Sequence, residues 1–319
     1  MKVLSLFDGI SCGYVALKRV GISIDKYYAS EIKPFAIKCS SKNNPDIIHI
    51  GDITKIHFWR GTLYTEDKRY NLGEIDLVIG GSPCQNFSVA RTSNKKTIDG
   101  LKGEQSSLFY EYARLLQEIQ PRYFLLENVR ITSPDDLAEI NGLLQVEPIR
   151  INSNLVSFQN RDRFYWTNIP NVTIPNDKGV DFQNYKDTDE NYCDKFIVPR
   201  TRSREIMWGN GVNGKCKNIT YCNKVNCLTL KQDRWANSGL IAYKDFCRYL
   251  TTRELELAQT LPIGYTKMLT RTQSENVLGD CWTVDVIAHI FSGLKEATVC
   301  QTKKNASMYI KRRWLNDYG

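Results

Sequence analysis

The feature that most constrains the fold is a series of short apolar runs in the first half of the chain, each followed by polar, reactive or turn-forming residues. We predict that these runs are buried strands, and they comprise residues 2–7, 26–30, 46–50, 76–79 and 123–126. Apolar residues at helical spacing between them predict helices, most clearly over residues 106–120. Strands that alternate with helices indicate a doubly wound, Rossmann-like α/β sheet.

The residues that follow the predicted strands are expected to share one crevice, because ligands of a doubly wound sheet bind beyond the carboxyl ends of its strands. In chain order, these residues are Asp8-Gly9, Glu31, Asp52, Pro83-Cys84 and Glu127-Asn128. A carboxylate after the second strand can accept hydrogen bonds from ribose hydroxyls, and one after the third can accept from an adenine amino group. The order of these residues therefore predicts a cofactor that contains adenosine.

Cys84 is the most specific local signal, because it lies on a rigid bend after Gly80-Gly81-Ser82-Pro83. A free thiol has a pKa of about 8.5, so a cysteine nucleophile needs an electropositive setting. Arg161 and Arg163 alternate with Gln159 and are expected to point to one face of an extended strand. We predict a nucleophilic cysteine that these arginines activate.

The second half of the chain is organised differently, since residues 171–245 are rich in Asn, Asp, Lys and Tyr and show little helical period. We predict a large domain of residues 1–170 plus 246–319 and a smaller irregular lobe of residues 171–245. A long surface insertion is the alternative for this region. The formal charge of +8 suits a polyanionic partner.

Most of the ten cysteines are expected to be free thiols in a reducing, cytoplasmic compartment. We find no signal peptide and no apolar stretch of the length that spans a membrane, so no membrane partner is predicted. Cys216, Cys222 and Cys227 lack the close pairing of zinc ligands, and we expect no metal site.

As a set, the motifs resemble those of the DNA cytosine-C5 methyltransferase family, and come closest to its compact de novo branch. In the family's order they are FDGISCG (7–13), ASEI (29–32), GDI (51–53), GGSPCQNFS (80–88), LLENV (125–129), QNRDRFYW (159–166), TTRE (251–254) and GDCWTVDV (279–286). The resemblance spans about residues 2–168 and 246–294. It implies a sheet of the S-adenosylmethionine-dependent methyltransferase type, with target recognition in the lobe of residues 171–245.

The resemblance also implies the roles of individual residues. Cys84 would attack C6 of cytosine, Glu127 would hold N3 and the exocyclic amine, and Arg161 and Arg163 would hold the target nucleotide. The implied contacts to S-adenosyl-L-methionine are Phe7, Asp8, Gly9, Ile10, Ser11, Cys12, Glu31, Ile32, Asp52, Ile53, Leu108 and Trp282. One departure is Asp280, where many members of the family have Asn.

The implied partner is double-stranded DNA, from which the target cytosine must be flipped because it is inaccessible within the duplex. Residues 87–103 are expected to form a loop that closes on DNA. The predicted DNA contacts are Ser88, Arg91, Lys95, Lys96, Gln159, Arg202, Arg204, Lys231, Gln232 and Arg234. A role in restriction-modification or phage modification is expected, with association near the nucleoid and either a monomer or a homodimer.

Three alternatives remain open at this stage. An RNA cytosine-C5 methyltransferase would carry a Cys-Phe-Thr signature, from which Cys227-Leu228-Thr229 departs at the middle position. A non-catalytic relative would lack the Cys84 or Glu127 equivalents. An NAD-dependent oxidoreductase would carry the G-x-G-x-x-G fingerprint, whereas Gly9 and Gly13 are spaced G-x-x-x-G.

Overall fold

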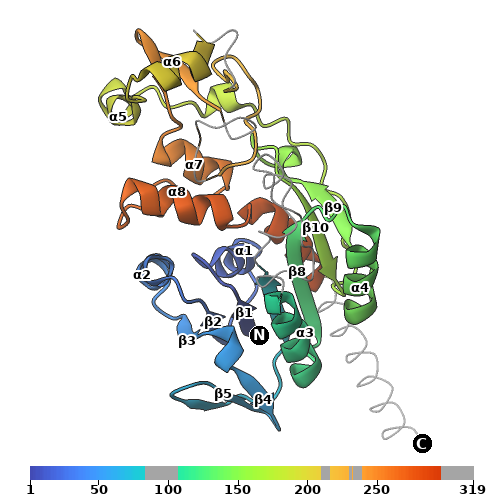
Figure 1. The fold of residues 1–319 in the computed structure, drawn as a ribbon. Coiled ribbons are helices and arrows are strands. Elements are labelled where there is room, and N and C mark those ends of the chain that lie inside the picture. The colour runs from blue at the N-terminus through green and yellow to red at the C-terminus, as the bar shows by residue number, and fades with distance from the viewer. Residues whose placement is uncertain (83–106, 210–215, 230–231, 233–238, 296–319) are drawn as a thin grey trace, which may run out of the picture.

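The computed structural model describes residues 1–82, 107–209, 216–229, 232 and 239–295, and Figure 1 shows their arrangement. Its centre is a seven-stranded sheet with the strand order β3-β2-β1-β7-β8-β10-β9. The strands are β1 (Lys2–Leu6), β2 (Lys26–Ser30), β3 (Ile48–Gly51), β7 (Leu77–Gly81), β8 (Tyr123–Val129), β9 (Ile149–Asn152) and β10 (Asp162–Thr167). The five strands from β3 to β8 are parallel, and β10 and β9 add an antiparallel edge. The predicted doubly wound α/β sheet is confirmed.

The order of the strands reverses between β1 and β7, which are neighbours in space but distant in the sequence. At such a switch point the connections leave the sheet on opposite faces and open a crevice at the carboxyl ends of the strands. Figure 1 shows the N-terminal strand β1 near the middle of the molecule. The residues after β1, β2, β7 and β8 are therefore brought to one edge.

Helices cover both faces of the sheet. They are α1 (Cys12–Arg19), α2 (Pro34–Asn43), α3 (Ser107–Ile119), α4 (Pro134–Leu144), α7 (Thr252–Ala258), α8 (Arg271–Asp280) and a last helix, Val284–Lys295. Alternate residues of β1 enter different cores: Val3 packs with α1, α2 and the C-terminal helices, and Leu4 packs with α3 and α4. This period of two explains why the central strands are apolar throughout.

Helix α3 forms as predicted because its apolar residues fall on one face. Phe109, Tyr112, Leu115 and Ile119 are buried against the sheet. The helix ends before Gln120, which has a left-handed backbone (φ 47°), and Pro121 follows.

A small three-stranded sheet lies between β3 and β7 in the chain and was not predicted. It consists of β4 (His57–Trp59), β5 (Thr62–Tyr64) and β6 (Arg69–Asn71), and it follows a 3-10 turn, Ile53–Lys55. Figure 1 shows β4 and β5 projecting at the end of the molecule opposite α5 and α6. Strands of three residues are too short to show a hydrophobic period, which is why they were not predicted.

The region predicted as a lobe contains short elements: 3-10 turns at Phe182–Asn184 and Asp194–Phe196, and the helices α5 (Glu190–Cys193) and α6 (Arg202–Trp208). The hairpin of β11 (Ile241–Tyr243) and β12 (Phe246–Arg248) follows. A small core of Val198, Trp208, Cys216, Leu240 and Cys247 holds this part together. The proposed boundary at residue 245 falls in the turn of the hairpin.

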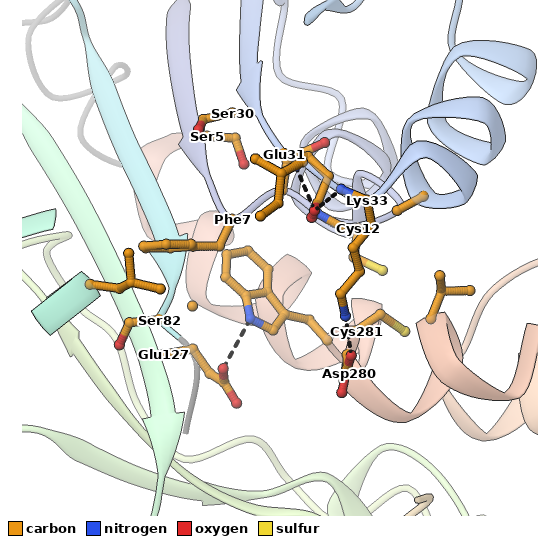
Figure 2. A pocket seen from close by; sticks show the side chains of 18 of the residues that line it. Ser5, Phe7, Cys12, Ser30, Glu31, Lys33, Ser82, Glu127, Asp280 and Cys281 are labelled. Atoms are coloured by element: carbon orange, nitrogen blue, oxygen red, sulfur yellow. Dashed lines mark hydrogen bonds and ion pairs between the residues drawn. The ribbon is translucent and has the colours of Figure 1, made fainter. Parts of the chain in front are cut away.

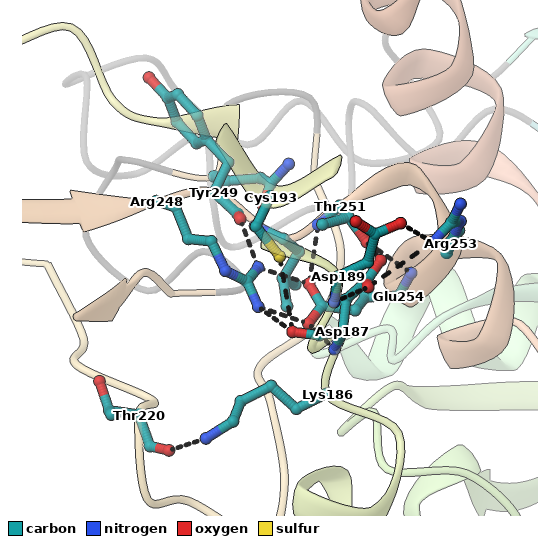
Figure 3. Close-up of polar contacts among 12 residues, drawn as sticks. Lys186, Asp187, Asp189, Cys193, Thr220, Arg248, Tyr249, Thr251, Arg253 and Glu254 are labelled. Carbon is teal, nitrogen blue, oxygen red and sulfur yellow. Dashed lines mark hydrogen bonds and ion pairs between the residues drawn. The ribbon is translucent and has the colours of Figure 1, made fainter. Parts of the chain in front are cut away.

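A buried ion pair connects this region to α7 (Figure 3). Two nitrogens of Arg248 each donate to Glu254, both at 2.8 Å, and neither side chain is more than 2% exposed. The same carboxylate accepts from the backbone N–H groups of Thr251 (2.7 Å) and Asp187 (2.8 Å). Glu254 also completes a capping box at the start of α7.

The eight cysteines in the described part of the chain are all free, as predicted. Among the same residues there is no group of three His, Cys, Asp or Glu side chains that could hold a metal ion. No single described helix has the length and apolar character to cross a membrane; the bent pair Arg271–Asp280 and Val284–Lys295 meets this test of length and composition only when its two helices are taken together.

Candidate functional site

A cavity of about 410 Å³ opens at the carboxyl ends of the parallel strands (Figure 2). It brings together most of the predicted cofactor contacts, namely Phe7, Asp8, Gly9, Cys12, Glu31, Ile32, Asp52, Ile53, Leu108 and Trp282. Glu127, Arg161 and Arg163 line the same cavity. In Figure 2, Glu31 lies near Phe7 and Lys33 in one part of the cavity, and Glu127 lies near Ser82 in another.

The loop after β1 curls tightly at the cavity. Phe7, Gly9 and Ser11 have left-handed backbones with φ of 57°, 60° and 66°. This conformation is costly for the two residues that are not glycine and is typical of functional loops. The side chains of Ile10 and Ser11 are fully buried, because the curl turns them into the core. Their predicted contact with the cofactor would therefore be made by backbone groups, and it stays a prediction.

Asp8 lies at the base of this loop with its carboxylate among hydroxyl groups. Tyr27 donates to it at 2.8 Å, and Ser11 donates to its other oxygen. Burial raises the pKa of Asp8, and the hydrogen bonds from Ser11, Ser5 and Tyr27 oppose the rise. The side chain therefore supports the loop as well as lining the cavity.

Two acceptors are held firmly at the ends of β2 and β3. The carboxylate of Glu31 accepts from the backbone N–H groups of Gly9 (2.8 Å), Ile32 (2.8 Å) and Lys33 (2.9 Å). Asp52 accepts from Thr54 N–H at 2.9 Å, which caps the 3-10 turn that follows. Carboxylates fixed by the backbone in this way are oriented acceptors for a ligand's hydroxyl or amino groups.

Glu127 occupies the other part of the cavity, where it is held between two donors. Arg163 Nε lies 3.0 Å from one carboxylate oxygen, and Trp282 Nε1 donates to the other at 3.1 Å. The Glu127 side chain is only 9% exposed. Trp282 was predicted as a cofactor contact, and its indole also touches the predicted catalytic carboxylate, a contact that the sequence did not reveal.

Asn128 is a further supporting residue that was not predicted in this role. Its side chain donates to the hydroxyl of Ser82 at 3.0 Å, and both residues are buried. Ser82 lines the cavity and lies two residues before Cys84. Cys84 itself lies outside the described residues, so its position relative to Glu127 stays a prediction.

Arg161 is almost fully buried beside the cavity, at 4% exposed, and its Nη1 donates to the Gly279 carbonyl at 3.0 Å. Gln159 was predicted to point to the same face as Arg161 and Arg163, but it does not line the cavity with them. It is fully buried, accepts from Leu228 N–H at 2.9 Å and donates to Ala258 O at 3.2 Å. The prediction of a DNA contact at Gln159 was therefore wrong.

Gln232 was also predicted to contact DNA, and its side chain is buried as well. It is 2% exposed, accepts from Leu250 N–H at 2.8 Å and donates to Glu275 at 3.2 Å. An amide whose hydrogen bonds are made within the protein is not free to bond with the edge of a base.

The other predicted DNA contacts lie away from the cavity or outside the described part of the chain. Arg202 is exposed and Arg204 half-buried at the start of α6, which Figure 1 places at one end of the molecule. The predicted contacts outside the described residues are Ser88, Arg91, Lys95, Lys96, Lys231 and Arg234.

Lys33 and Asp280 form an ion pair of 2.7 Å at the cavity, where Lys33 is half-buried and Asp280 is exposed. Figure 2 shows this pair between the residues after β2 and the end of α8. Lys33 was not predicted as a site residue, although its place two residues after Glu31 is a signal that could have found it. Asp280, where many members of the family have Asn, thus has an ion-pair partner within this chain.

Residues 1–147 match the family model described as C-5 cytosine-specific DNA methylase. The chain is 33% identical to the orphan methyltransferase M.Rho11sI of Bacillus phage rho11s, over 56% of this chain and 35% of the relative. It is 27% identical to the type II methyltransferase M1.ScrFI of Lactococcus lactis subsp. cremoris, over 92% and 78% of the two chains. The chain thus spans about a third of the length of the phage relative.

The fold is similar to that of the Entamoeba histolytica methyltransferase EhMeth. The TM-score is 0.68 at 17% sequence identity, and the match covers 92% of this chain and 98% of the other. At this level of identity the likeness concerns the fold.

Proposed function

The first 147 residues of this chain belong to the family of C-5 cytosine-specific DNA methylases, and on this premise we propose that the protein transfers a methyl group from S-adenosylmethionine to carbon 5 of cytosine in double-stranded DNA. The observation that carries the proposal is the position of Glu127. A carboxylate held by Arg163 and Trp282 shares one cavity with the oriented carboxylates of Glu31 and Asp52.

The cavity fits an adenosine-containing cation such as S-adenosylmethionine. Its volume of about 410 Å³ is in the usual range for small-ligand sites. Glu31 would hold the ribose hydroxyls, and Phe7 and Ile32 would flank the adenine. Asp52 and Ile53 would contact the adenine edge. When bound, the cofactor supplies an electrophilic methyl group on a sulfonium centre.

A glycine supports this fit, because a Cβ at Gly81 would lie 2.8 Å from Trp282 Nε1 and 3.0 Å from Glu127 Oε2. Such distances are too short for real contacts, so only glycine lets these two side chains approach the end of β7. The absence of a side chain keeps space open where the cofactor and the target base would meet.

The residues of the chain would act on the base in a defined order. We assign the nucleophile to Cys84, whose thiolate would add to C6 of cytosine. Glu127 would hold N3 and the exocyclic amine, so that the electron pair released by the addition makes C5 nucleophilic. After C5 has been alkylated, a base removes the C5 proton, the electrons return to form the C5–C6 double bond and the Cys84 sulfur is expelled.

Arg161 and Arg163 would stabilise negative charge on the flipped nucleotide, and Arg163 would also orient Glu127. Contacts to the duplex are assigned to residues 171–245, including Arg202 and Arg204, and to the loop of residues 87–103. Phosphate contacts by such arginines position the protein on DNA without reading its sequence. Relatives named as phage orphan and type II methyltransferases favour a modification enzyme of phage or restriction-modification origin.

The proposed reaction is tested by bisulfite sequencing of a random-sequence duplex after incubation with the protein and S-adenosylmethionine. We expect protected cytosines in one short sequence context. Cys84→Ser is expected to abolish this protection while cofactor binding, measured by calorimetry, persists. Cofactor binding without protection of any duplex, or methylation of RNA only, would overturn the proposal. Normal activity of the Ser variant would overturn the assignment of the nucleophile.

Substitution of Gly81 tests the shape of the cavity. Gly81→Ala is expected to weaken cofactor binding and reduce methyl transfer, because the new Cβ displaces Trp282 or Glu127. Gly142→Ala is the matched control: it lies in α4, and nothing lies within 4 Å of its added Cβ. We expect this control to retain activity and to gain up to about 1 kcal/mol of stability from helix propensity. Equal activity of the two variants would contradict the proposed arrangement.

A further inference from the structure

Cys227 lies between the guanidinium groups of the two cavity arginines. Its Sγ is 3.6 Å from Arg161 Nη1 and 3.7 Å from Arg163 Nη2. The chain on either side of it is fixed: Val225 forms a parallel bridge with Gln159, and Leu228 N–H donates to the Gln159 side chain at 2.9 Å. The buried Gln159 thus holds a segment of the predicted recognition lobe so that its cysteine reaches the two arginines that line the cavity.

If the Cys227 thiol is neutral, the groups around it carry an excess of positive charge. Arg161 and Arg163 carry two positive charges, and Glu127 supplies one negative charge beside Arg163. Asp162, between the two arginines in the sequence, is bound instead by Arg150 through two nitrogens, at 2.9 Å and 2.8 Å. The Arg161 guanidinium donates to the neutral Gly279 carbonyl and to the Cys227 sulfur. A buried guanidinium without an anionic partner is costly.

The other titratable groups around Arg161 do not supply the missing charge. Tyr165 of β10 and Cys281 after α8 both interact with it. Burial raises the pKa of both groups, so they are neutral near pH 7. For Cys227, burial raises the pKa, but Arg161 and Arg163 outweigh this and bring the pKa of its thiol below the ordinary value. Among the described groups that face the arginines, the Glu127 carboxyl and the Cys227 thiol are therefore the two that can supply a negative charge.

We propose that Cys227 is a positioning residue: as a thiolate it pairs with Arg161 and Arg163 and holds both guanidinium groups in the orientation that the reaction requires. The roles of the two arginines rest on the proposed function. The ionisation of Cys227 does not, since it is argued from the charges and contacts around its sulfur. The two parts are therefore tested by separate measurements.

The ionisation is tested by the pH dependence of iodoacetamide alkylation in the full chain, followed peptide by peptide in a mass spectrometer. Alkylation requires the thiolate, so the midpoint reports the pKa of each thiol. Cys222 is the matched control, because it is also half-buried and its Sγ lies 3.6 Å from the Asn218 carbonyl. We expect Cys227 to react with a midpoint about one pH unit or more below that of Cys222. A midpoint equal to that of Cys222 would overturn the proposal.

The positioning role is tested by two substitutions assayed for methyl transfer across pH. Cys227→Ser keeps the size and removes the charge, and we expect kcat/KM to fall about tenfold or more at pH 7. Cys227→Asp restores an anion and is expected to recover part of this loss. The wild type should lose activity as pH falls through the thiol pKa, and the Asp variant should keep activity to lower pH.

The outcomes separate the two proposals. If the wild type methylates DNA and both variants match its rate and pH profile, Cys227 has no positioning role. If the wild type methylates nothing, the proposed function fails, and the alkylation midpoint still decides whether Cys227 is a thiolate. Thermal unfolding of both variants identifies any loss of activity that comes from misfolding.

Discussion

Glu127→Gln is expected to reduce methyl transfer roughly 10²–10³-fold, the range found when a positioned acid–base or charge-stabilising group is removed. Glutamine has nearly the same shape, but it cannot share a proton with a ring nitrogen. It also leaves Arg163, whose Nε lies 3.0 Å from the carboxylate, without its anionic partner. Single-turnover methylation of duplex DNA by the folded variant measures the effect directly.

The control for this variant is Glu139→Gln, the same chemical change outside the cavity. Glu139 is an exposed residue of α4 that accepts from Tyr110 Oη at 2.6 Å. We expect wild-type activity for the control, and cofactor binding that changes far less than turnover for Glu127→Gln. A Glu127→Gln variant with near-normal turnover would remove this carboxylate from the mechanism.

Glu254→Gln is expected to destabilise the protein by about 3–5 kcal/mol, because it leaves the buried Arg248 without a counter-ion. The two terminal nitrogens of Arg248 donate to this carboxylate, and neither side chain is more than 2% exposed. The change also weakens the acceptor for the backbone N–H groups of Thr251 and Asp187. Urea unfolding at pH 7, followed by tryptophan fluorescence, measures the loss.

The matched control is Asp245→Asn, which removes one carboxylate charge from an exposed pair. Asp245 lies 3.0 Å from Arg200 and its side chain is 85% exposed. Water replaces the partner of an exposed ion, so we expect an unfolding midpoint indistinguishable from that of the wild type. Equal destabilisation by the two substitutions would show that the buried pair does not anchor the region around β12 to α7.

Many parts of the site were predictable because they depend on local order in the chain. An apolar run predicts a strand, and a parallel sheet places the residue after each strand at the same edge. This rule brings Asp8, Glu31 and Asp52 to one cavity, as the structure shows. Glu127 was predicted to follow its strand as well, but it reaches the cavity from within the last part of β8. The short strands β4 to β6 escaped prediction because three residues carry no readable period.

The errors were at positions where distant packing decides the environment. Gln159 and Gln232 are polar and were expected at the surface, but segments from elsewhere in the chain cover them and satisfy their amides. The side-chain directions in the loop after β1 were also not predictable, since Ile10 and Ser11 are turned into the core where the backbone at Ser11 is left-handed. A motif identifies a loop and does not say which way each side chain points.

The sequence by itself determined the doubly wound sheet, the strand ends that form the cavity and the acidic residues within it, because periodicity and strand order are local properties. Only the tertiary structure placed Trp282 against Glu127, 155 residues away in the chain, and Cys227 between Arg161 and Arg163. Such contacts arise when remote segments pack around one core, and the spacing of residues along the chain carries no record of them.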